Sequence, residues 1–503
     1  MSANTASADA VNDSSGIDDA TAYEMVIGLE VHVELSTATK LFCGCPNEFG
    51  SEPNTNVCPV CLGLPGSLPV LNERVVEFAL RIGEALHFSV PESSIFHRKN
   101  YFYPDMPKDY QVSQYDEPIC IDGYLDVGGK RVGIERAHME EDTGKTTHVG
   151  GGGRIHEADF SLVDYNRAGV PLMEIVSRPD IRSAEVARAY VSELRAVLEA
   201  IGVSDVKMEE GSLRVDANIS MRAVGAEQMG TKVEIKNMNS LRSLGRALDY
   251  EQARQIARLN AGERIVQETR HWDEADGRTH GMRSKEEAFD YRYFPEPDLV
   301  PVAPDDAWRE RVRVAMPELP ANRRARLVDE WGIGEYDAGV LVALPGLADY
   351  AEAAVTAAGA PAKDTLNWVT GDVLGFLNET GAAATTLLVD PSGLAELVAL
   401  VRDGTLSRNQ ARDVLGRCLR SGDRPSDVVA AQGLAQVSDE GELAGVVSEI
   451  VAASSGEVER YRAGDDKERK KLRGFFMGKV MAATKGAGNP KVLSRLLDEA
   501  LDR

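Results

Sequence analysis

The spacing of apolar residues changes near residue 300, and this change constrains the fold more than any other feature of the chain. Between residues 24 and 300, stretches such as "MVIGLEVHVEL" alternate apolar and polar side chains, as half-buried β-strands do. Turns rich in Pro, Gly and Asn separate these stretches. Two segments, 72–86 and 183–202, instead repeat apolar residues at helical spacing. We therefore predict an α+β domain over residues 23–300, with a large mixed, mainly antiparallel sheet.

The chain beyond residue 300 is rich in Ala, Leu, Arg and Glu, with helical periods and short breakers. We predict two all-α domains there, over 301–400 and 401–503, and the cap signal at Thr405 and Ser407 precedes the first helix of the second. Residues 461–503 contain 11 Lys and Arg but 6 Asp and Glu, a local positive excess that is typical of a nucleic-acid-binding patch. A solvated helical surface has the same composition, so both interpretations stay open.

The chain as a whole is acidic, with a formal net charge of −24. This charge argues against a protein that coats nucleic acid through bulk electrostatics, so a polynucleotide partner must be met by local basic patches. Residues 1–22 are small, polar and acidic, lack the features of a signal peptide, and are predicted to form a disordered tail. No apolar run approaches the ~20 residues of a membrane span. We expect a cytoplasmic protein with no membrane association.

Four of the six cysteines form two close pairs, Cys43-x-Cys45 and Cys58-x-x-Cys61, which a turn-rich loop joins. Two such pairs supply the four thiolates of a tetrahedral zinc site. Four thiolates close the coordination shell and leave no position for a substrate water. We therefore predict a structural Zn²⁺ in a zinc-ribbon-like insert over residues 43–61.

The polar face of the strand-like stretch 25–35 carries Glu30, His32 and Glu34, where a face that only meets water more often carries Thr, Ser or Lys. Glu174 lies within the apolar segment "VPLMEIV" and needs a cation, a proton or a hydrogen-bond partner there. More carboxylates occur in the segment "HMEED". Carboxylates with one imidazole suit Mg²⁺ or Mn²⁺ beside a phosphate substrate. Taken singly, each of these carboxylates is more typical of a surface or ion-pair residue than of a functional site, and His32 fits a satisfied strand histidine as well as a metal ligand.

The sequence excludes nucleotide binding through a P-loop. Gly144, Lys145 and Thr146 match the end of the P-loop motif, but Met139 occupies the position of its required first glycine. The segment 96–118 interleaves basic and aromatic residues, a combination that binds phosphates and stacks on bases. An aromatic loop that packs on the core is the alternative for this segment.

Several long motifs resemble one known family, the B subunits of the glutamine-dependent aspartyl/glutamyl-tRNA amidotransferases. The motifs are "IGLEVHVEL", "CPVCLGLPGSLPVLN", "RKNYFYPDMPKDYQ", "HMEEDTGK", "VDYNRAGVPLMEIV", "VSDVKMEEGSLRVDANIS", "EIKNMNS" and "DYRYFPEPDL". The resemblance runs in order from residue 24 to the C-terminus. It implies a cradle-shaped catalytic domain over 23–300, then a helical domain over 301–400 and a helical tail domain over 401–503 that binds tRNA.

The resemblance also implies an activity, that of a glutamine-hydrolysing carbon–nitrogen ligase. A mischarged Glu-tRNA(Gln) or Asp-tRNA(Asn) would enter the cradle, and ATP with Mg²⁺ would phosphorylate its side-chain carboxylate. Ammonia that an A subunit releases from glutamine would then displace the phosphate and leave the amide. A small C subunit would hold A and B together in a heterotrimer.

Site residues follow from the resemblance, position by position. Mg²⁺ ligands fall on Glu30 and His32, on Glu141 with Glu140 beside it, and on Glu174, and the ligands Glu30, His32, Glu141 and Glu174 would be catalytic. The motif matches make three cations candidates for phosphate contacts: Arg98, Lys99 and Arg214. Family members that keep the four cysteines bind zinc, which agrees with a structural Zn²⁺ at Cys43, Cys45, Cys58 and Cys61.

Two other functions remain compatible with the residues alone. A non-catalytic zinc-ribbon RNA-binding protein would use the cysteines and the basic tail and leave the acidic residues structural. A stand-alone metal-dependent phosphotransferase would use the acidic residues and have no need of the tail.

Overall fold

The computed structural model describes residues 22–150, 158–282, 291–434, 440–484 and 488–502. Apart from Ala22, the expected N-terminal tail lies outside these ranges. The chain forms two compact units, Met1–Leu319 and Pro320–Arg503, the N-terminal and C-terminal units, which are described separately. Among the described residues, every named strand lies in the N-terminal unit, and the named elements of the C-terminal unit are all helices. The predicted α+β domain followed by helical domains is therefore confirmed.

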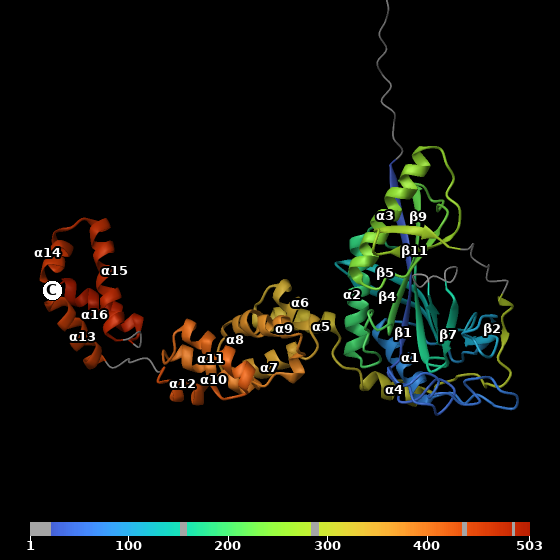
Figure 1. The fold of residues 1–503 in the computed structure, drawn as a ribbon, viewed down its shortest axis with the longest axis horizontal. Coiled ribbons are helices and arrows are strands. Elements are labelled where there is room, and N and C mark those ends of the chain that lie inside the picture. The colour runs from blue at the N-terminus through green and yellow to red at the C-terminus, as the bar shows by residue number, and fades with distance from the viewer. Residues whose placement is uncertain (1–21, 151–157, 283–290, 435–439, 485–487, 503) are drawn as a thin grey trace, which may run out of the picture. The chain divides into compact units, whose positions relative to one another are not determined.

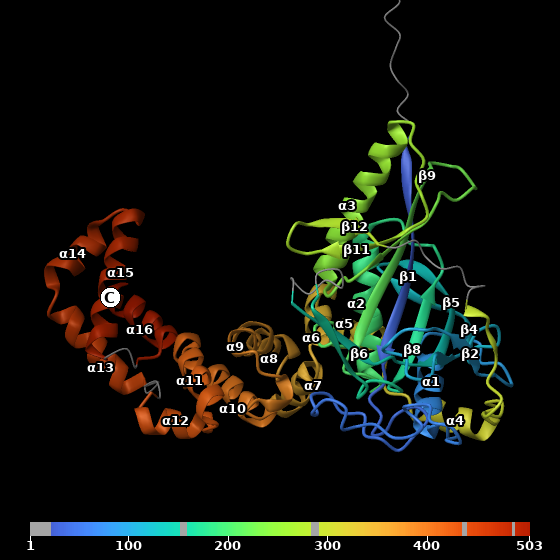
Figure 2. The ribbon, with the colours of Figure 1, turned by 45° about the vertical axis from the view of Figure 1, so that its right-hand side comes forward.

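An eight-stranded sheet forms the centre of the N-terminal unit (Figure 1). Its strands in spatial order are β12 (Arg278–Gly281), β11 (Thr269–Asp273), β10 (Val233–Lys236), β9 (Leu213–Ala223), β1 (Tyr23–Glu34), β8 (Pro171–Ser177), β5 (Lys130–Glu141) and β4 (Cys120–Val127). All neighbours pair antiparallel except β10 and β11, as expected from the sequence. Figure 2 shows the long strand β1 between β9 and β8.

Two smaller sheets complete the strands of this unit. One joins β13 (Phe294–Pro295), β2 (His97–Asn100) and β3 (Tyr110–Ser113) in that order. The other is a hairpin of β6 (Lys145–Val149) and β7 (Phe160–Asp164). The three-stranded sheet lies against the main sheet at β5, because residues of β3 contact the last residues of that strand.

One face of the main sheet is apolar and is covered by helices. On β1, the side chains of Leu29, Val31 and Val33 are at most 1 % exposed. They belong to one core with α1 (Glu73–Ala85), α2 (Ala184–Ala200) and α3 (Leu241–Asn260). The caps Asn72 and Ser183 begin α1 and α2, so both helices predicted in this part of the chain are confirmed. A fourth helix, α4 (Asp306–Val314), ends the unit. The opposite face of the sheet is therefore free to carry polar groups.

The C-terminal unit consists of helices around two separate cores. The first core runs from Leu327 to Val429, and the second from Leu443 to Leu501. The helices of the first are α5 (Pro320–Trp331), α6 (Glu335–Ala343), α7 (Leu347–Ala358), α8 (Ala362–Trp368), η3 (Val369–Val373), α9 (Leu374–Thr380), η4 (Ala384–Thr386), α10 (Pro391–Arg402), α11 (Arg408–Ser421) and α12 (Pro425–Gln432). Those of the second are α13 (Glu440–Ala452), α14 (Ser455–Ala463), α15 (Asp466–Ala483) and α16 (Pro490–Asp502).

The first helical core continues past residue 400, where the sequence led us to expect a domain boundary. Ser407 does cap a helix, α11, with a reciprocal capping box to Gln410. However, buried Leu415 of α11 and Leu394 of α10 share one core. A capping signal marks the start of a helix and says nothing about which core that helix joins.

No single helix among the described residues is long and apolar enough to cross a membrane. The pair α6 and α7 together meet the length and composition, but the chain bends by 115° between them.

Candidate functional site

The polar face of the sheet brings together ionisable side chains from four strands. The strand register places Arg214 of β9, His32 of β1, Glu174 of β8 and His138 of β5 directly opposite one another in one row. Directly opposed residues on neighbouring antiparallel strands have Cα atoms about 4.5–5.5 Å apart and point to the same side. Antiparallel pairing thus unites residues that lie far apart in the sequence.

Two imidazoles and two carboxylates meet beside this row, because Glu140 follows His138 on the same face of β5. We call His32, His138, Glu140 and Glu174 the polar cluster. One carboxylate oxygen of Glu174 lies 3.5 Å from Nε2 of His32 and 3.3 Å from Nε2 of His138. The oxygens of Glu140 lie 3.6 Å and 3.8 Å from the same two nitrogens. The Ser113 hydroxyl also donates to Glu140, at 3.3 Å. His32, Glu140 and Glu174 each offer one ligand atom within 4.8 Å of the others, as a shared cation requires.

The charges of the polar cluster are mutually dependent. Burial disfavours the charged imidazole of His138, but Glu174 and Glu140 outweigh burial and raise its pKa to about 9. Burial likewise opposes ionisation of Glu174, but the two imidazoles hold its pKa well below its usual range. A divalent cation bound here would replace the protons that the imidazoles share with the carboxylates.

Lys99 adds a further positive charge beside the polar cluster. Its ammonium lies 4.9 Å from the ring centroid of Tyr291. Burial tends to lower the pKa of Lys99, but the charges of Glu140, Tyr293 and Glu174 raise it overall. The lysine side chain therefore carries its charge close to both carboxylates of the cluster.

Glu30 and Glu141 are the predicted ligands that lie apart from the polar cluster. Glu30 shares the polar face with His32, but its carboxylate accepts a hydrogen bond from Asn218 at 2.8 Å. Glu141 has an ion pair with Lys108 and accepts a hydrogen bond from the amide of Val112 at 2.8 Å. Adjacent residues of a strand point to opposite faces, so Glu140 and Glu141 cannot both face the cluster.

The three predicted phosphate-binding cations also differ in their surroundings. The Arg98 guanidinium makes a bidentate ion pair with Glu296, at 2.6 and 2.7 Å, and contacts Asp298 at 3.2 Å. Lys99, the next residue, lies over the ring of Tyr291, and the charges of Glu140 and Glu174 help to raise its pKa. Arg214 stands in the row beside His32 and donates to the Asp142 carboxylate at 2.7 Å.

Glu34 lies at the end of β1 near the same arginine. Its pKa is raised to about 7, first by burial and then by the carboxylate of Asp142, while Arg214 and Arg167 oppose the rise. Glu34 of β1 and Glu140 of β5 both pair with Leu172 of the strand between them, β8. Glu34 therefore borders the polar cluster. It is thus a carboxyl group that can hold or release a proton near neutral pH.

His138 was not predicted as a site residue from the sequence, although a signal for it was present. In the segment "AHMEE" of β5, His138 and Glu140 alternate with Ala137 and Met139, which are fully buried in the core. The same alternation of His and Glu singled out Glu30 and His32 on β1. Pairing of β5 with β8 then brings His138 opposite Glu174.

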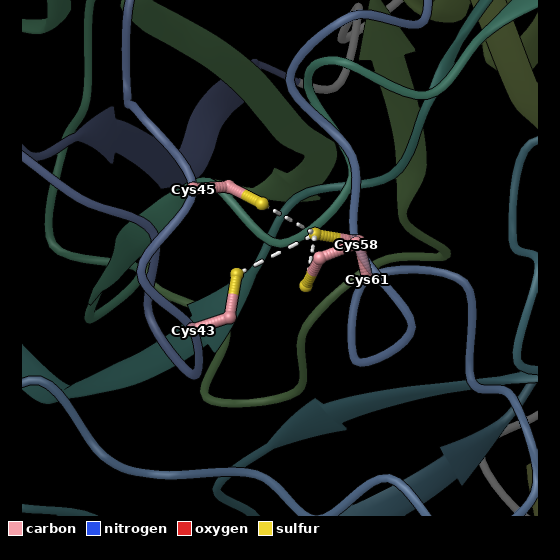
Figure 3. A group of neighbouring side chains, drawn as sticks. All are labelled: Cys43, Cys45, Cys58 and Cys61. Atoms are coloured by element: carbon pink, nitrogen blue, oxygen red, sulfur yellow. Dashed lines mark hydrogen bonds between the residues drawn. The ribbon is translucent and has the colours of Figure 1, made fainter.

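The four paired cysteines form a second cluster, which we call the cysteine centre (Figure 3). The sulfur of Cys61 lies 3.4 Å from that of Cys43 and 3.7 Å from those of Cys45 and Cys58. Tetrahedral coordination with Zn–S bonds of about 2.3 Å places the sulfurs about 3.8 Å apart. The predicted convergence of the four cysteines is therefore confirmed, and their spacing fits zinc.

Comparisons of the sequence with known proteins identify the family to which the chain belongs. Residues 25–310 match the model of the GatB/GatE catalytic domain, and residues 349–501 match that of the GatB domain. Over 483 residues the chain is 53 % identical to the B subunit of the aspartyl/glutamyl-tRNA(Asn/Gln) amidotransferase of Moorella thermoacetica, a match that covers 95 % of this chain and 100 % of the relative. The chain belongs to this family of amidotransferase B subunits.

Other members of the family match to a similar extent. The protein of the same name from Persephonella marina is 50 % identical over 483 residues, covering 95 % of this chain and 99 % of the relative. The one from Caldanaerobacter subterraneus is 49 % identical over 485 residues, covering 96 % and 100 %. The resemblance in the sequence motifs is thereby confirmed. The part that matches the catalytic domain contains both the polar cluster and the cysteine centre.

Proposed function

We propose that this chain is the tRNA-binding, carboxylate-activating subunit of an ATP-dependent amidotransferase that acts on Glu-tRNA(Gln), Asp-tRNA(Asn) or both. The observation that carries the proposal is the convergence of two imidazoles and two carboxylates at one point of the polar face. This point lies in the part of the chain that matches the GatB/GatE catalytic domain. The relatives' names supply the reaction class, a tRNA-dependent amidation.

The polar cluster fits a hard divalent cation, because it offers carboxylate oxygens and imidazole nitrogens without thiolates. His32, Glu140 and Glu174 would hold Mg²⁺. Glu30 lies on the same face of the sheet, and His138 contacts the Glu174 carboxylate at 3.3 Å. When bound, such a cation neutralises the phosphates of ATP and aligns the γ-phosphoryl group with the substrate carboxylate. The residues of the sheet contribute placement, since their register fixes them relative to one another.

Lys99 and Arg214 are the cations that we propose as contacts of the ATP phosphates or the substrate carboxylate. Lys99 carries its charge beside Glu140 and Glu174, and Arg214 is the neighbour of His32 in the row. Arg98 is engaged by Glu296, so we propose for it a role in holding β2 against β13. Transfer of the γ-phosphoryl group to the carboxylate yields an acyl phosphate and ADP, and attack by ammonia then yields the amide and phosphate.

The cysteine centre would hold a structural Zn²⁺. Four thiolates satisfy the tetrahedral ion completely, which leaves no site for substrate. Its part in the proposed function is to fix the insert 43–61 in the N-terminal unit. We propose no chemical step at this centre.

A local patch within residues 461–503, with 11 Lys and Arg against 6 Asp and Glu, carries the positive charge that a tRNA partner requires. Helix α15 exposes Lys467, Arg469, Lys470 and Lys471 in its first two turns. We propose that residues 401–503 bind the body of the tRNA while its aminoacyl end reaches the polar cluster. Ammonia would come from a glutaminase A subunit that a small C subunit joins to this chain, all in the cytoplasm.

The test is amide formation on mischarged tRNA by the chain co-expressed with A and C subunits. With ATP and with ammonium chloride in place of glutamine, we expect wild-type protein to form Gln-tRNA or Asn-tRNA. Glu174→Gln should abolish this product even with ammonium present, because it removes a charge from the polar cluster. Glu310→Gln, on the exposed surface of α4, is the matched control and should react like wild type.

The outcomes separate the candidate functions. If the wild-type complex forms no amide on either tRNA, the proposed reaction is wrong. A non-catalytic RNA-binding protein would bind tRNA and leave ATP turnover unaffected by Glu174→Gln. The comparisons with amidotransferase subunits do not favour that alternative.

A further inference from the structure

Lys40 is a fully buried lysine that lies against the cysteine centre. Its side chain is 0 % exposed. The ammonium donates to the carbonyl oxygens of Asn56 at 2.7 Å and Ala168 at 2.8 Å, and more weakly to that of Tyr165 at 3.4 Å. It also lies 3.6 Å from the sulfur of Cys61. A single cation thus contacts the cysteine insert and a distant segment of the chain.

The charge of Lys40 needs a partner, because an unpaired ammonium is costly to bury. Three carbonyl oxygens satisfy its hydrogen bonds but bring no charge. In the described part of the chain, no carboxylate forms an ion pair with this ammonium. Four thiolates around a divalent ion carry a net charge of about −2, and Cys61 presents that charge to the lysine. The cysteine centre and Lys40 therefore balance each other's charge.

We propose that Lys40 is a positioning residue that stabilises the metal-bound cysteine centre through Cys61 and clamps it to the segment 165–169. This inference rests on the zinc centre proposed above. The carbonyl contacts tie the lysine to both sides of the clamp, one in the insert and two in the distant segment. Groups that contact metal ligands in this way commonly change metal affinity by 10–100-fold when removed.

The segment 165–169 connects this clamp to the border of the polar cluster. The Gly169 amide donates to the carbonyl oxygen of Asp142 at 3.0 Å, and the Arg167 guanidinium lies 3.3 Å from the Asp142 carboxylate. Asp142 in turn accepts from Arg214, the neighbour of His32. Lys40 thus provides a continuous path of contacts from the cysteine centre to the residues that border the polar cluster.

The first measurement is the rate at which a chelator removes zinc from the full-length protein. Lys40→Met keeps the shape of the side chain and removes its charge and its donors. We expect this variant to lose zinc about tenfold faster than wild type, or more. Thr37→Val is the matched control, because the buried Thr37 hydroxyl donates to the nearby carbonyl of Thr39, accepts a long hydrogen bond of 3.5 Å from Asn47, and does not contact the cysteines. Its rate of zinc loss should equal that of wild type.

A second measurement reports on Cys61 directly. With Co²⁺ in place of zinc, the thiolate-to-metal charge-transfer band should move to longer wavelength in Lys40→Met, because the thiolate loses a cation that lowers its electron energy. Hydrogen exchange should also accelerate at amides 165–169 and not at α3, to which the described hydrogen bonds of Lys40 do not run. A merely space-filling role of Lys40 would leave the cobalt band in place.

The results distinguish failure of this inference from failure of the zinc centre. Wild-type protein that purifies without zinc and takes up no Co²⁺ into the cysteines would overturn the centre itself. Wild type that holds zinc, with Lys40→Met losing it no faster and showing an unmoved cobalt band, would overturn the role of Lys40 alone. If Lys40→Met does not fold, Lys40→Arg decides the point, since its altered donor geometry must shift the band if the side chain contacts Cys61.

Discussion

Glu140 and Glu141 are adjacent carboxylates with opposite expected roles, and exchanging each for Gln separates those roles. Glu140 faces two imidazoles in the polar cluster, whereas Glu141 accepts from Lys108 and from the amide of Val112. Both side chains are buried, at 3 % and 4 % exposed, so solvent screens neither of them. We expect Glu140→Gln to impair cation binding and Glu141→Gln to lower the stability of the fold.

The magnitude for Glu140 follows from its charge and its distance to the cation site. A unit charge about 4 Å from a dication contributes roughly 8 kcal/mol at an effective dielectric constant of ~20. Desolvation of the buried carboxylate offsets most of this. A net loss of about 2.7 kcal/mol corresponds to a hundredfold weaker Kd. For Glu141, the loss of a charged acceptor to a buried lysine should lower the free energy of unfolding by about 3 kcal/mol.

The assay is titration of the full-length protein with Mn²⁺, followed by electron paramagnetic resonance of the free ion, together with denaturant unfolding of both variants. We expect Glu140→Gln to bind Mn²⁺ about a hundredfold more weakly, and Glu141→Gln to bind it within about threefold of wild type. Equal losses of Mn²⁺ affinity in the two variants would refute the assignment of the faces of β5. So would a Glu140→Gln variant that binds Mn²⁺ normally.

Three further predictions concern the phosphate contacts, the pH dependence and the tail. Lys99→Met should raise the KM for ATP about tenfold or more in steady-state assays, because it removes a charge-assisted contact; Arg98→Lys should change KM much less and lower the melting temperature. Because the pKa of His138 is raised to about 9 in the metal-free fold, its protonation stabilises that fold, and this contribution is complete below the unfolded pKa of ~6.5. The contribution is lost as the pH rises through about 9. Denaturant titrations at several pH values measure this change in the free energy of unfolding. Replacing Lys470 and Lys471 by Glu should weaken tRNA binding and reduce the dependence of log Kd on log salt, as filter binding measures, whereas a purely solvated face would leave both unchanged.

The elements of this fold were predictable from the sequence where a local pattern decides them. The alternation in β1 and the helical spacing over 72–86 and 183–202 predicted one strand and two helices that the structure contains. The convergence of the cysteines was also predictable, because their spacing within 43–61 brings them together through local turns. Each of these predictions depends on residues close in sequence.

The composition of the polar cluster could not be predicted in the same way, because it depends on which strands pair and in what register. Glu174 meets His138 only because β8 pairs with β5, and their register is not encoded in either segment alone. The alternation of side chains within β5 did distinguish two residues that the family resemblance left together. Glu140 and Glu141 are adjacent in the strand, so only one of them can share a face with His32. The period-two rule, applied to "HMEE", selects His138 together with Glu140.

The two faces of β5 at its end explain how one short segment serves both the polar cluster and the cysteine insert. Glu140 points to the cluster, and Glu141 points away and holds Lys108. The carbon chain of Lys108 packs against Gly63, two residues after Cys61, where a Cβ would clash with it and where φ is +63°, so the chain approaches this closely only through a glycine. Lys40 holds the insert from within, at Cys61. The strand that positions the proposed cation ligand Glu140 therefore also holds, through Glu141, the lysine that packs on the chain just after Cys61.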